Sequence, residues 1–402
     1  MSLKISFTGD LMALLPQNNA SLDKKTGIYN YDRIFEKVAY VLKDSDYVVG
    51  NLETPIAGEE LEYTKEPTVF NTPLAFAQSI KKAGFDFVSI ANNHCLDRGV
   101  IGLKKTILNL DSIGLEYSGA YLTEELSENP FVKEIHGVKV AILAYTYGTN
   151  SKWRNNELHG ESKYLVDLFR KQDQYCGVND KTAGYRIKKY IKKSLPRFLS
   201  EAIKSSVIED CVLSEREEDL LYLQRLKNKI QRAKQNSDIV IMCMHAGGQY
   251  NSHIGKYTHD LVYKLKEYGC DLIVGSHPHC VLNSEYIDDV YVTYSLGNFC
   301  FTPNWGYYKR GVFAEYSVVL NIYMDELKKE IVKKTVYLTK VIVDSDGNSV
   351  IYHIKDLYFS LKKDKDKRKL FEDSCSVLSR YFGKKIDSFD ISSLEINIDE
   401  YI

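Results

Sequence analysis

The sequence is short of the features that mark membrane-spanning and disulfide-rich proteins. No stretch approaches the roughly 18 consecutive apolar residues of a transmembrane helix. The eight cysteines are scattered through 402 residues without a Cys-x-x-Cys pair, which is typical of reduced, buried thiols. The N-terminus also lacks the charged and then apolar segments of a secretion signal. As the sequence stands, we expect a cytoplasmic protein without an intrinsic transmembrane segment, and one associated with the cell surface if an anchor has been removed.

Charge of either sign is not in excess, since the formal net charge is -1. Nothing global therefore favours nucleic acid or an acidic membrane surface, and we expect no nucleic-acid partner. Apolar residues make up 44% of the chain, which is enough for a sizeable core in one large domain or two ordinary ones.

Six short apolar runs, rich in β-branched and aromatic residues, each end at a turn and predict strands buried on both faces. They are 3–7, 47–50, 85–90, 238–243, 271–274 and 290–294. Helical patterns lie between them at 31–43, 73–82, 103–113 and 258–268. Alternating strands and helices indicate an α/β layer architecture.

The remaining segments predict a hairpin and a change of pattern near the C-terminus. We expect the hairpin at 131–145, and a second, mostly antiparallel sheet from strands at 312–322, 331–343 and 349–361. The charged segment from 151 to about 213 lacks clear strands, and we interpret it as an insertion over the carboxyl edge of the sheet, a lid or a solvated face. We therefore expect one domain at 1–362 with this insertion and a helical extension at 363–402.

Polar signatures follow the predicted strands. They bring Asp10, Glu53, Asn93 with His94, His245, and His277 with His279 to strand ends. Open α/β sheets place their sites beyond the carboxyl ends of strands, so we expect these side chains at one edge of one sheet. Carboxylates, an amide and imidazoles gathered there indicate a site that binds metal and activates water.

Each residue taken alone has a second interpretation. Asp10 is equally suited to cap a turn, and Glu53 to lie on the surface. Asp97 would orient the His94 imidazole or serve as the N-cap of the next helix. Cys95 and Cys280 follow motif histidines, so each is a soft metal ligand or a buried thiol. Proline favours an extended backbone in His277-Pro278-His279, which would place both imidazoles on one face.

At this point the chain resembles the bacterial CapA family of capsule and poly-γ-glutamate biosynthesis proteins. The resemblance rests on motifs in a fixed order: Gly9-Asp10, Asn51-Leu52-Glu53, Ala91-Asn92-Asn93-His94, His245, Gly275-Ser276-His277-Pro278-His279 and Tyr294-Ser295-Leu296-Gly297-Asn298-Phe299. That family is similar in fold to calcineurin-like metallophosphoesterases. The resemblance implies a four-layer α/β/β/α sandwich of metallophosphatase type.

The resemblance also implies a dinuclear centre of two divalent ions (Mn, Zn, Fe or Mg). Asp10 and His279 would hold one ion, Glu53 would bridge, and His94 would act as general acid or stabilise the transition state. The second ion would have three ligands, Asn93, His245 and His277. The chain departs from the pattern at Met12, where phosphoesterases carry histidine, and at Ala246 and Gln249, where CapA-like chains carry Trp and Glu.

Three functions follow as hypotheses. The first is a metal-dependent hydrolase of a phosphoester, with a dinuclear centre that activates water. The second keeps the fold but cleaves an amide or ester in an anionic polymer such as poly-γ-glutamate. The third is a non-catalytic protein that binds such a polymer or a capsule-synthesis partner. Fold and motif do not decide among them.

Overall fold

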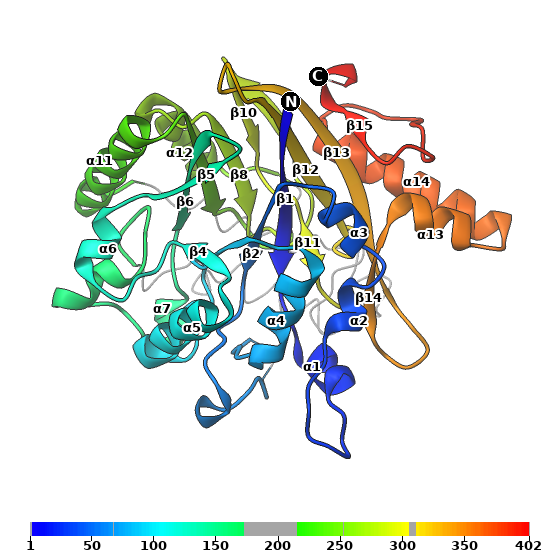
Figure 1. The fold of residues 1–402 in the computed structure, drawn as a ribbon, viewed down its shortest axis with the longest axis horizontal. Coiled ribbons are helices and arrows are strands. Elements are labelled where there is room, and N and C mark those ends of the chain that lie inside the picture. Colours follow the sequence, from blue (N-terminus) through cyan, green and yellow to red (C-terminus); the bar gives the residue numbers. More distant parts are fainter. Residues whose placement is uncertain (1, 67, 173–214, 252, 305–310, 402) are drawn as a thin grey trace, which may run out of the picture.

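Two stacked β-sheets form the centre of the molecule, and helices cover the outer face of each (Figure 1). The computed structural model describes residues 2–66, 68–172, 215–251, 253–304 and 311–401. Within these ranges, no helix is both long and apolar enough to cross a membrane. The order of layers is helix, sheet, sheet, helix, so the four-layer sandwich implied by the resemblance is confirmed.

The first sheet has the strand order β14-β13-β12-β1-β2-β3-β4, with β11 beside β1 and β15 beside β13. Strands β1 to β4 run parallel, and β12 to β14 continue the sheet antiparallel from the other side of β1. The bounds are β1 Ser2–Leu11, β2 Tyr47–Leu52, β3 Phe87–Ser89, β4 Glu116–Ser118, β11 Asn298–Cys300, β12 Tyr316–Asp325, β13 Glu330–Val343, β14 Ser349–His353 and β15 Ile396–Asn397.

The second sheet has the order β5-β6-β7-β8-β10-β9. Strands β6, β7, β8 and β10 are parallel, and the two outer strands are antiparallel to their neighbours. The bounds are β5 Phe131–Ile135, β6 Val138–Thr146, β7 Ile239–His245, β8 Leu272–Ser276, β9 Ser284–Ile287 and β10 Val290–Thr293. Strands β5 and β6 form the predicted hairpin, with His136 and Gly137 at positive φ in its turn.

Helices α1 to α5 lie over the first sheet or its end, and α11 and α12 lie beside the second, at the left of Figure 1. The α-helices are α1 Leu15–Ser21, α2 Asp32–Phe35, α3 Ala39–Leu42, α4 Leu74–Ala83, α5 Gly99–Ile113, α6 Glu124–Glu128, α7 Ser151–Arg154, α11 Leu220–Asn236, α12 Lys256–Tyr268, α13 Ile354–Ser360 and α14 Asp364–Tyr381. Short 3₁₀ turns are η1 Glu59–Leu61, η2 Gly160–Leu165, η3 Glu217–Asp219 and η4 Ile398–Glu400.

Alternating side chains along the strands build the three interfaces between the four layers. In β7, Ile239 and Ile241 face the other sheet, whereas Val240 and Met242 face α11 and α12. The side-chain period of a strand is two residues, so a strand buried on both faces supplies two cores at once. This explains why the predicted strands read as continuous apolar runs.

The prediction of a second, separate antiparallel sheet near the C-terminus is wrong. Strand β12 pairs with β1, so the late strands extend the first sheet. Pairing partners far apart in sequence are not encoded by the local pattern. The last predicted strand is also half helix, because residues 354–361 carry apolar side chains at helical spacing and His353 caps α13 by accepting from the Lys355 amide.

Two further expectations change in part. The single helix expected at 31–43 is broken into α2 and α3, although the face it was expected to bury is buried. Most of the expected insertion, residues 173–214, lies outside the described residues. In its described beginning, Val166 and Leu168 bridge to Ala120 and Thr146 and are buried in the core. The interpretation as a lid stays a prediction. The division at residue 362 stays a prediction.

Candidate metal centre

The polar signatures gather where the two sheets meet, at the carboxyl ends of their parallel strands. Asp10 lies near the end of β1, Glu53 directly follows β2, and the loop after β3 carries Asn93 and His94. The other sheet supplies His245 at the end of β7, and His277 and His279 directly after β8. The expectation of one edge of one sheet is therefore wrong: two sheets contribute to one site.

The segment that contains Leu296 and Gly297 joins the two sheet ends through backbone hydrogen bonds. The Leu296 amide donates to the Gly275 carbonyl (3.2 Å), and the Asp10 amide donates to the Gly297 carbonyl (2.9 Å). A Cβ atom at Gly9 would lie 1.9 Å from that Gly297 oxygen, and one at Gly275 would lie 2.2 Å from the Tyr294 oxygen. Glycine at both positions lets the backbones approach and brings the ligands of the two sheets together.

The histidine pair reaches the site by a different backbone from the predicted one. His277 has φ 98° and His279 has φ 56°, so neither residue is extended. The rings nevertheless lie 5.9 Å apart between centroids, within one site. Non-glycine residues held at positive φ are uncommon and cluster at functional sites, where surrounding structure maintains them.

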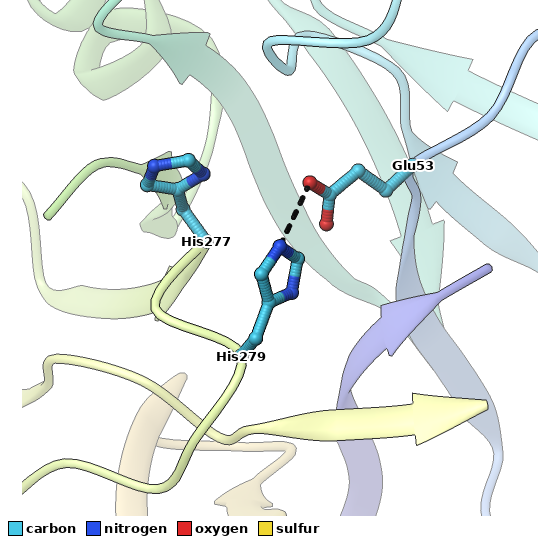
Figure 2. Close-up of side chains that lie close together, drawn as sticks. All are labelled: Glu53, His277 and His279. Atoms are coloured by element: carbon cyan, nitrogen blue, oxygen red, sulfur yellow. Dashed lines mark ion pairs between the residues drawn. The ribbon is translucent and has the colours of Figure 1, made fainter. Parts of the chain in front are cut away.

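Six side chains, which we call the ligand cluster, come together and are buried: Asp10, Glu53, Asn93, His245, His277 and His279. Glu53 Oε1 lies 3.6 Å from His245 Nε2. The same oxygen lies 3.7 Å from His279 Nε2 (Figure 2). Two metal-sized groupings share Glu53, one with His277 and His279 and one with Asp10 and His245. In each, the ligand atoms lie within 4.8 Å of one another.

Ligand atoms in the cluster are buried without hydrogen-bond partners. Neither carboxylate oxygen of Glu53 and neither ring nitrogen of His277 has one, although both residues are fully buried. Burial raises the pKa of Glu53 well above its usual range, and the Asp10 carboxylate adds to the rise. Burial also lowers the pKa of His277 well below its usual range, and the neighbouring His279 and His94 imidazoles lower it further.

A cation fits this arrangement on chemical grounds. Unpaired buried polar atoms are costly, and a cation would satisfy both carboxylate oxygens and imidazole lone pairs. His245 Nε2 and Asn93 Oδ1 lie 2.9 Å apart. Two ligands at usual bond lengths from one cation lie about 3 Å apart when they meet at a right angle. The donor set, oxygen and imidazole nitrogen, suits a divalent metal.

His94 lies beside the ligand cluster and contacts Asp97 and Phe70. Its Nδ1 lies 2.7 Å from Asp97 Oδ2, which also accepts the Phe70 amide at 2.7 Å. The Phe70 ring packs on the imidazole, with centroids 4.2 Å apart. Asp97 therefore contacts His94 instead of capping the helix, whose N-cap is Arg98. A buried carboxylate at Nδ1 fixes the ring and leaves Nε2 as its working nitrogen.

A family comparison accounts for this order of motifs. Residues 4–303 match the family described as bacterial capsule synthesis protein PGA_cap. The chain belongs to this family.

The PGA biosynthesis protein CapA of Bacillus subtilis (strain 168) is 25% identical over 325 residues, which cover 79% of this chain and 68% of that protein. The capsule biosynthesis protein CapA of Bacillus anthracis is 28% identical over 299 residues, covering 72% of this chain and 58% of that protein. This chain thus spans only part of either relative's length.

Among solved structures, a candidate 5′-nucleotidase from Staphylococcus aureus in complex with α-ketoglutarate aligns with a TM-score of 0.44 and 12% identity. The alignment covers 93% of this chain and 58% of that one. A likeness this weak supports no inference about activity or ligand.

This PGA_cap chain differs from the phosphoesterase pattern at Met12, which is buried among Leu14, Phe70, Phe301 and Ala314. A thioether in an apolar cluster stands where that pattern has an imidazole, so Met12 supplies no nitrogen to the side of the site near Asp10. The soft-ligand interpretation of Cys280 is not favoured, since its thiol donates to the Asn251 carbonyl at 3.2 Å. Within the described part of the chain, the metal-sized groupings include no cysteine.

Sequence reasoning missed the side chains that contact the ligands from behind. Asn51 and Ser276 contact His245, and Asn298 contacts His279. Tyr147 and Tyr250 lie against His277 and His279, with ring centroids 4.8 Å and 5.5 Å apart. The three polar side chains all stand inside the motifs quoted above: Asn51 lies near the end of β2, Ser276 ends β8 and Asn298 begins β11. The strand-end signal was therefore available for Asn51 and Ser276.

Proposed function

We propose that this PGA_cap protein is a metal-dependent hydrolase of phosphoester type. The proposal is carried by the buried, unpartnered oxygens of Glu53 and nitrogens of His277, which lie among further metal-ligating side chains. An apo site with this composition is unfavourable for folding, since burial penalises each lone pair that lacks a donor. A cation removes that penalty, which is the physical reason to expect one here.

The ligand cluster would hold two divalent ions, as the resemblance implies, with Glu53 between them. Support for a shared Glu53 comes from its place in both metal-sized groupings. Bound divalent ions supply Lewis acidity to a phosphoryl oxygen and make water nucleophilic near neutral pH. The remaining steps belong to the protein's own side chains.

His94 is proposed to deliver a proton to the leaving oxygen from Nε2. Asp97 accepts at Nδ1 and stabilises the imidazolium that holds this proton. Phe70 packs on one ring face and limits the motion of the ring. Because His94 follows Asn93 directly, proton donor and ligand are positioned by one loop.

The substrate class is proposed as a phosphoester or an anionic polymer. The names of the two Bacillus relatives connect them with capsule and PGA biosynthesis, and we extend that process to this chain as a proposal. Polyanionic substrates suit a cationic centre, and Tyr147 and Tyr250 lie against its histidines.

The test separates ligand from proton donor. His277→Ala is expected to lower bound metal, whereas His94→Ala keeps the metal and loses about 10²–10⁴-fold in turnover. Metal stoichiometry and hydrolysis of p-nitrophenyl phosphate and polyglutamate with added Mn²⁺ are measured for both variants. His259→Ala is a matched control, because its side chain is 48% exposed on α12.

Two results would contradict the catalytic assignment. One is loss of metal in His94→Ala, which would make His94 a ligand. The other is wild-type protein saturated with Mn²⁺ that turns over neither substrate. In that case a protein that binds anionic polymer without cleaving it becomes the leading hypothesis. Cleavage of polyglutamate alone would instead assign the centre to amide hydrolysis.

A further inference from the structure

We propose that the two halves of the metal centre start in opposite imidazole tautomers: Asn298 presets His279 to bind metal, whereas Asn51 holds His245 in the tautomer that cannot. The inference rests on the metal centre of the proposed function and adds an order of loading to it. It makes Asn51, Ser276 and Asn298 positioning residues.

His279 is set by an amide whose orientation is fixed. Asn298 Nδ2 donates to two carbonyl oxygens, those of His279 (3.0 Å) and Ala314 (2.9 Å). Its Oδ1 must therefore be the atom that faces His279 Nδ1 at 3.0 Å. An amide oxygen only accepts, so Nδ1 carries the proton. Asp10 Oδ2, a second acceptor 3.3 Å from Nδ1, agrees with this assignment.

In the neutral His279 ring the other nitrogen, Nε2, then carries no proton. Its Nε2 lone pair faces Glu53 Oε1 at 3.7 Å. A lone pair and a carboxylate oxygen do not attract each other, but both bind a cation placed between them. This half of the centre needs no rearrangement before it takes up metal.

His245 is set the opposite way. Asn51 Nδ2 donates to Asp10 Oδ1 at 2.8 Å, and a carboxylate only accepts, so the amide nitrogen is on this side. Ser89 donates to Asn51 Oδ1 at 3.0 Å, which fixes the other side. The same Nδ2 lies 3.3 Å from His245 Nδ1, so Nδ1 faces a donor and accepts.

With Nδ1 as acceptor, the neutral His245 ring carries its proton on Nε2. That proton points to Asn93 Oδ1 at 2.9 Å, and it occupies both atoms predicted to bind the second metal. Metal binding at Nε2 requires this proton to leave to solvent and another proton to bind at Nδ1. The number of protons on the ring stays the same. Ser276 Oγ, 2.9 Å from Nδ1, can accept the new N–H, whereas Asn51 Nδ2 cannot.

The consequence is ordered loading. The side of His279 binds the first cation without rearrangement, and the side of His245 binds the second only after the tautomer changes. Ser276 lowers the free energy of the new tautomer by accepting a hydrogen bond from Nδ1. Asn51 favours the original tautomer, because its Nδ2 only donates. Partners behind a metal ligand typically change metal affinity about 10–100-fold when mutated.

The first test uses metal-free protein and does not depend on activity. Long-range ¹H–¹⁵N spectra of histidine-labelled protein in chelator distinguish the two neutral tautomers. We expect Nδ1–H for His279 and Nε2–H for His245, assigned with His279→Gln and His245→Gln. Nδ1–H at His245 in the metal-free wild type would overturn the proposal.

The second test is calorimetric titration with Zn²⁺. Wild type should bind in two steps; Ser276→Ala should weaken the second about 10–100-fold and leave the first unchanged. Asn298→Ala should weaken the first, and Ser276→Thr, which keeps the hydroxyl, should restore wild-type binding. A single binding step, or equal weakening of both steps by Ser276→Ala, contradicts the proposal. Absence of hydrolysis contradicts only the proposed function, because neither test measures turnover.

Discussion

The two ends of β1 carry buried polar clusters of opposite character. Near its start, Lys4 lies in a closed network, whereas Asp10 at its end lies in the open ligand cluster. Both residues are buried and lie on the same strand. The difference therefore reflects the partners that the rest of the chain supplies.

At the closed end every charge has a partner. Lys4 Nζ contacts Glu395 at 2.7 Å and Asp44 at 2.9 Å, and Glu395 also accepts from Tyr323 and Thr335. Burial alone would raise the pKa of Glu395, but these hydrogen bonds, led by that from Lys4, hold it below its usual value. This network joins the N-terminal strand to the C-terminal tail.

At the open end the pKa of the buried glutamate, Glu53, is shifted in the opposite direction. Burial and the Asp10 charge raise the pKa of Glu53, and no hydrogen bond offsets them. A structural cluster is completed by the chain itself, while a binding cluster is left incomplete for its ligand. Unpaired buried atoms therefore distinguish a site from a salt bridge better than burial or charge does.

The largest effect should follow from breaking the closed end. Glu395→Gln removes the charge of one partner of Lys4, whose side chain is 9% exposed, and leaves the exposed Asp44 as the other. Removing one partner of a buried ion pair costs about 3–5 kcal/mol, and we expect the lower end because Glu395 is 21% exposed. Urea denaturation measures the loss, with exposed Glu400→Gln as the control. Equal stability of both variants would mean that the network contributes nothing.

The same exchange at the open end should have the opposite sign without metal. In chelator, Glu53→Gln removes a buried carboxyl group whose oxygens lack hydrogen-bond partners, and we expect stabilisation of about 1–3 kcal/mol, the usual cost of an unsatisfied buried group. Thermal denaturation in EDTA checks this, and a less stable variant would contradict it.

Adding metal should invert the ranking of wild type and Glu53→Gln. Wild type gains about 2.7 kcal/mol at a metal concentration of 100 times Kd, and the variant gains less because a shared ligand is lost. A variant that gains as much as wild type would show that Glu53 is not a ligand.

The strand-end motifs could be predicted from the sequence because two local features define them. A run of buried residues sets the strand, and the first polar residues after it must lie at its carboxyl end. Asp10, Glu53 and His245 were placed in this way. The four-layer order came from the motif resemblance and not from periodicity, which indicated only an α/β class.

What the sequence did not reveal depends on distant or backbone detail. The pairing of β12 with β1 joins residues over 300 positions apart, as Ile5 with Ile322, and no local pattern encodes it. The positive φ of His277 is set by the turn that follows β8 and was missed because proline suggested extension. Asn51 and Asn298 were quoted only as motif letters, since their hydrogen-bond partners come from other strands.

The smallest effect is a pH dependence that Glu53 masks in wild type. The pKa of His245 and of His277 is lowered from 6.5, chiefly by burial, so below about pH 6.5 the unfolded chain binds protons that the folded chain does not. Their contribution to stability is thus present above pH 6.5 and lost as pH falls. Glu53 acts oppositely, because its raised pKa makes the folded chain retain a proton that the unfolded chain releases above about 4.5.

Removing Glu53 should therefore expose the histidine effect. In metal-free Glu53→Gln, the free energy of unfolding should rise from pH 5.5 to 6.5 by at most about 1.4 kcal/mol per histidine, the limit for one proton per pH unit. Adding His277→Asn to Glu53→Gln should remove one histidine's share of that slope, as urea denaturation at several pH values would show. An unchanged slope would mean that His277 takes up its proton in the folded chain, and that the open end tolerates charge as readily as the closed end does.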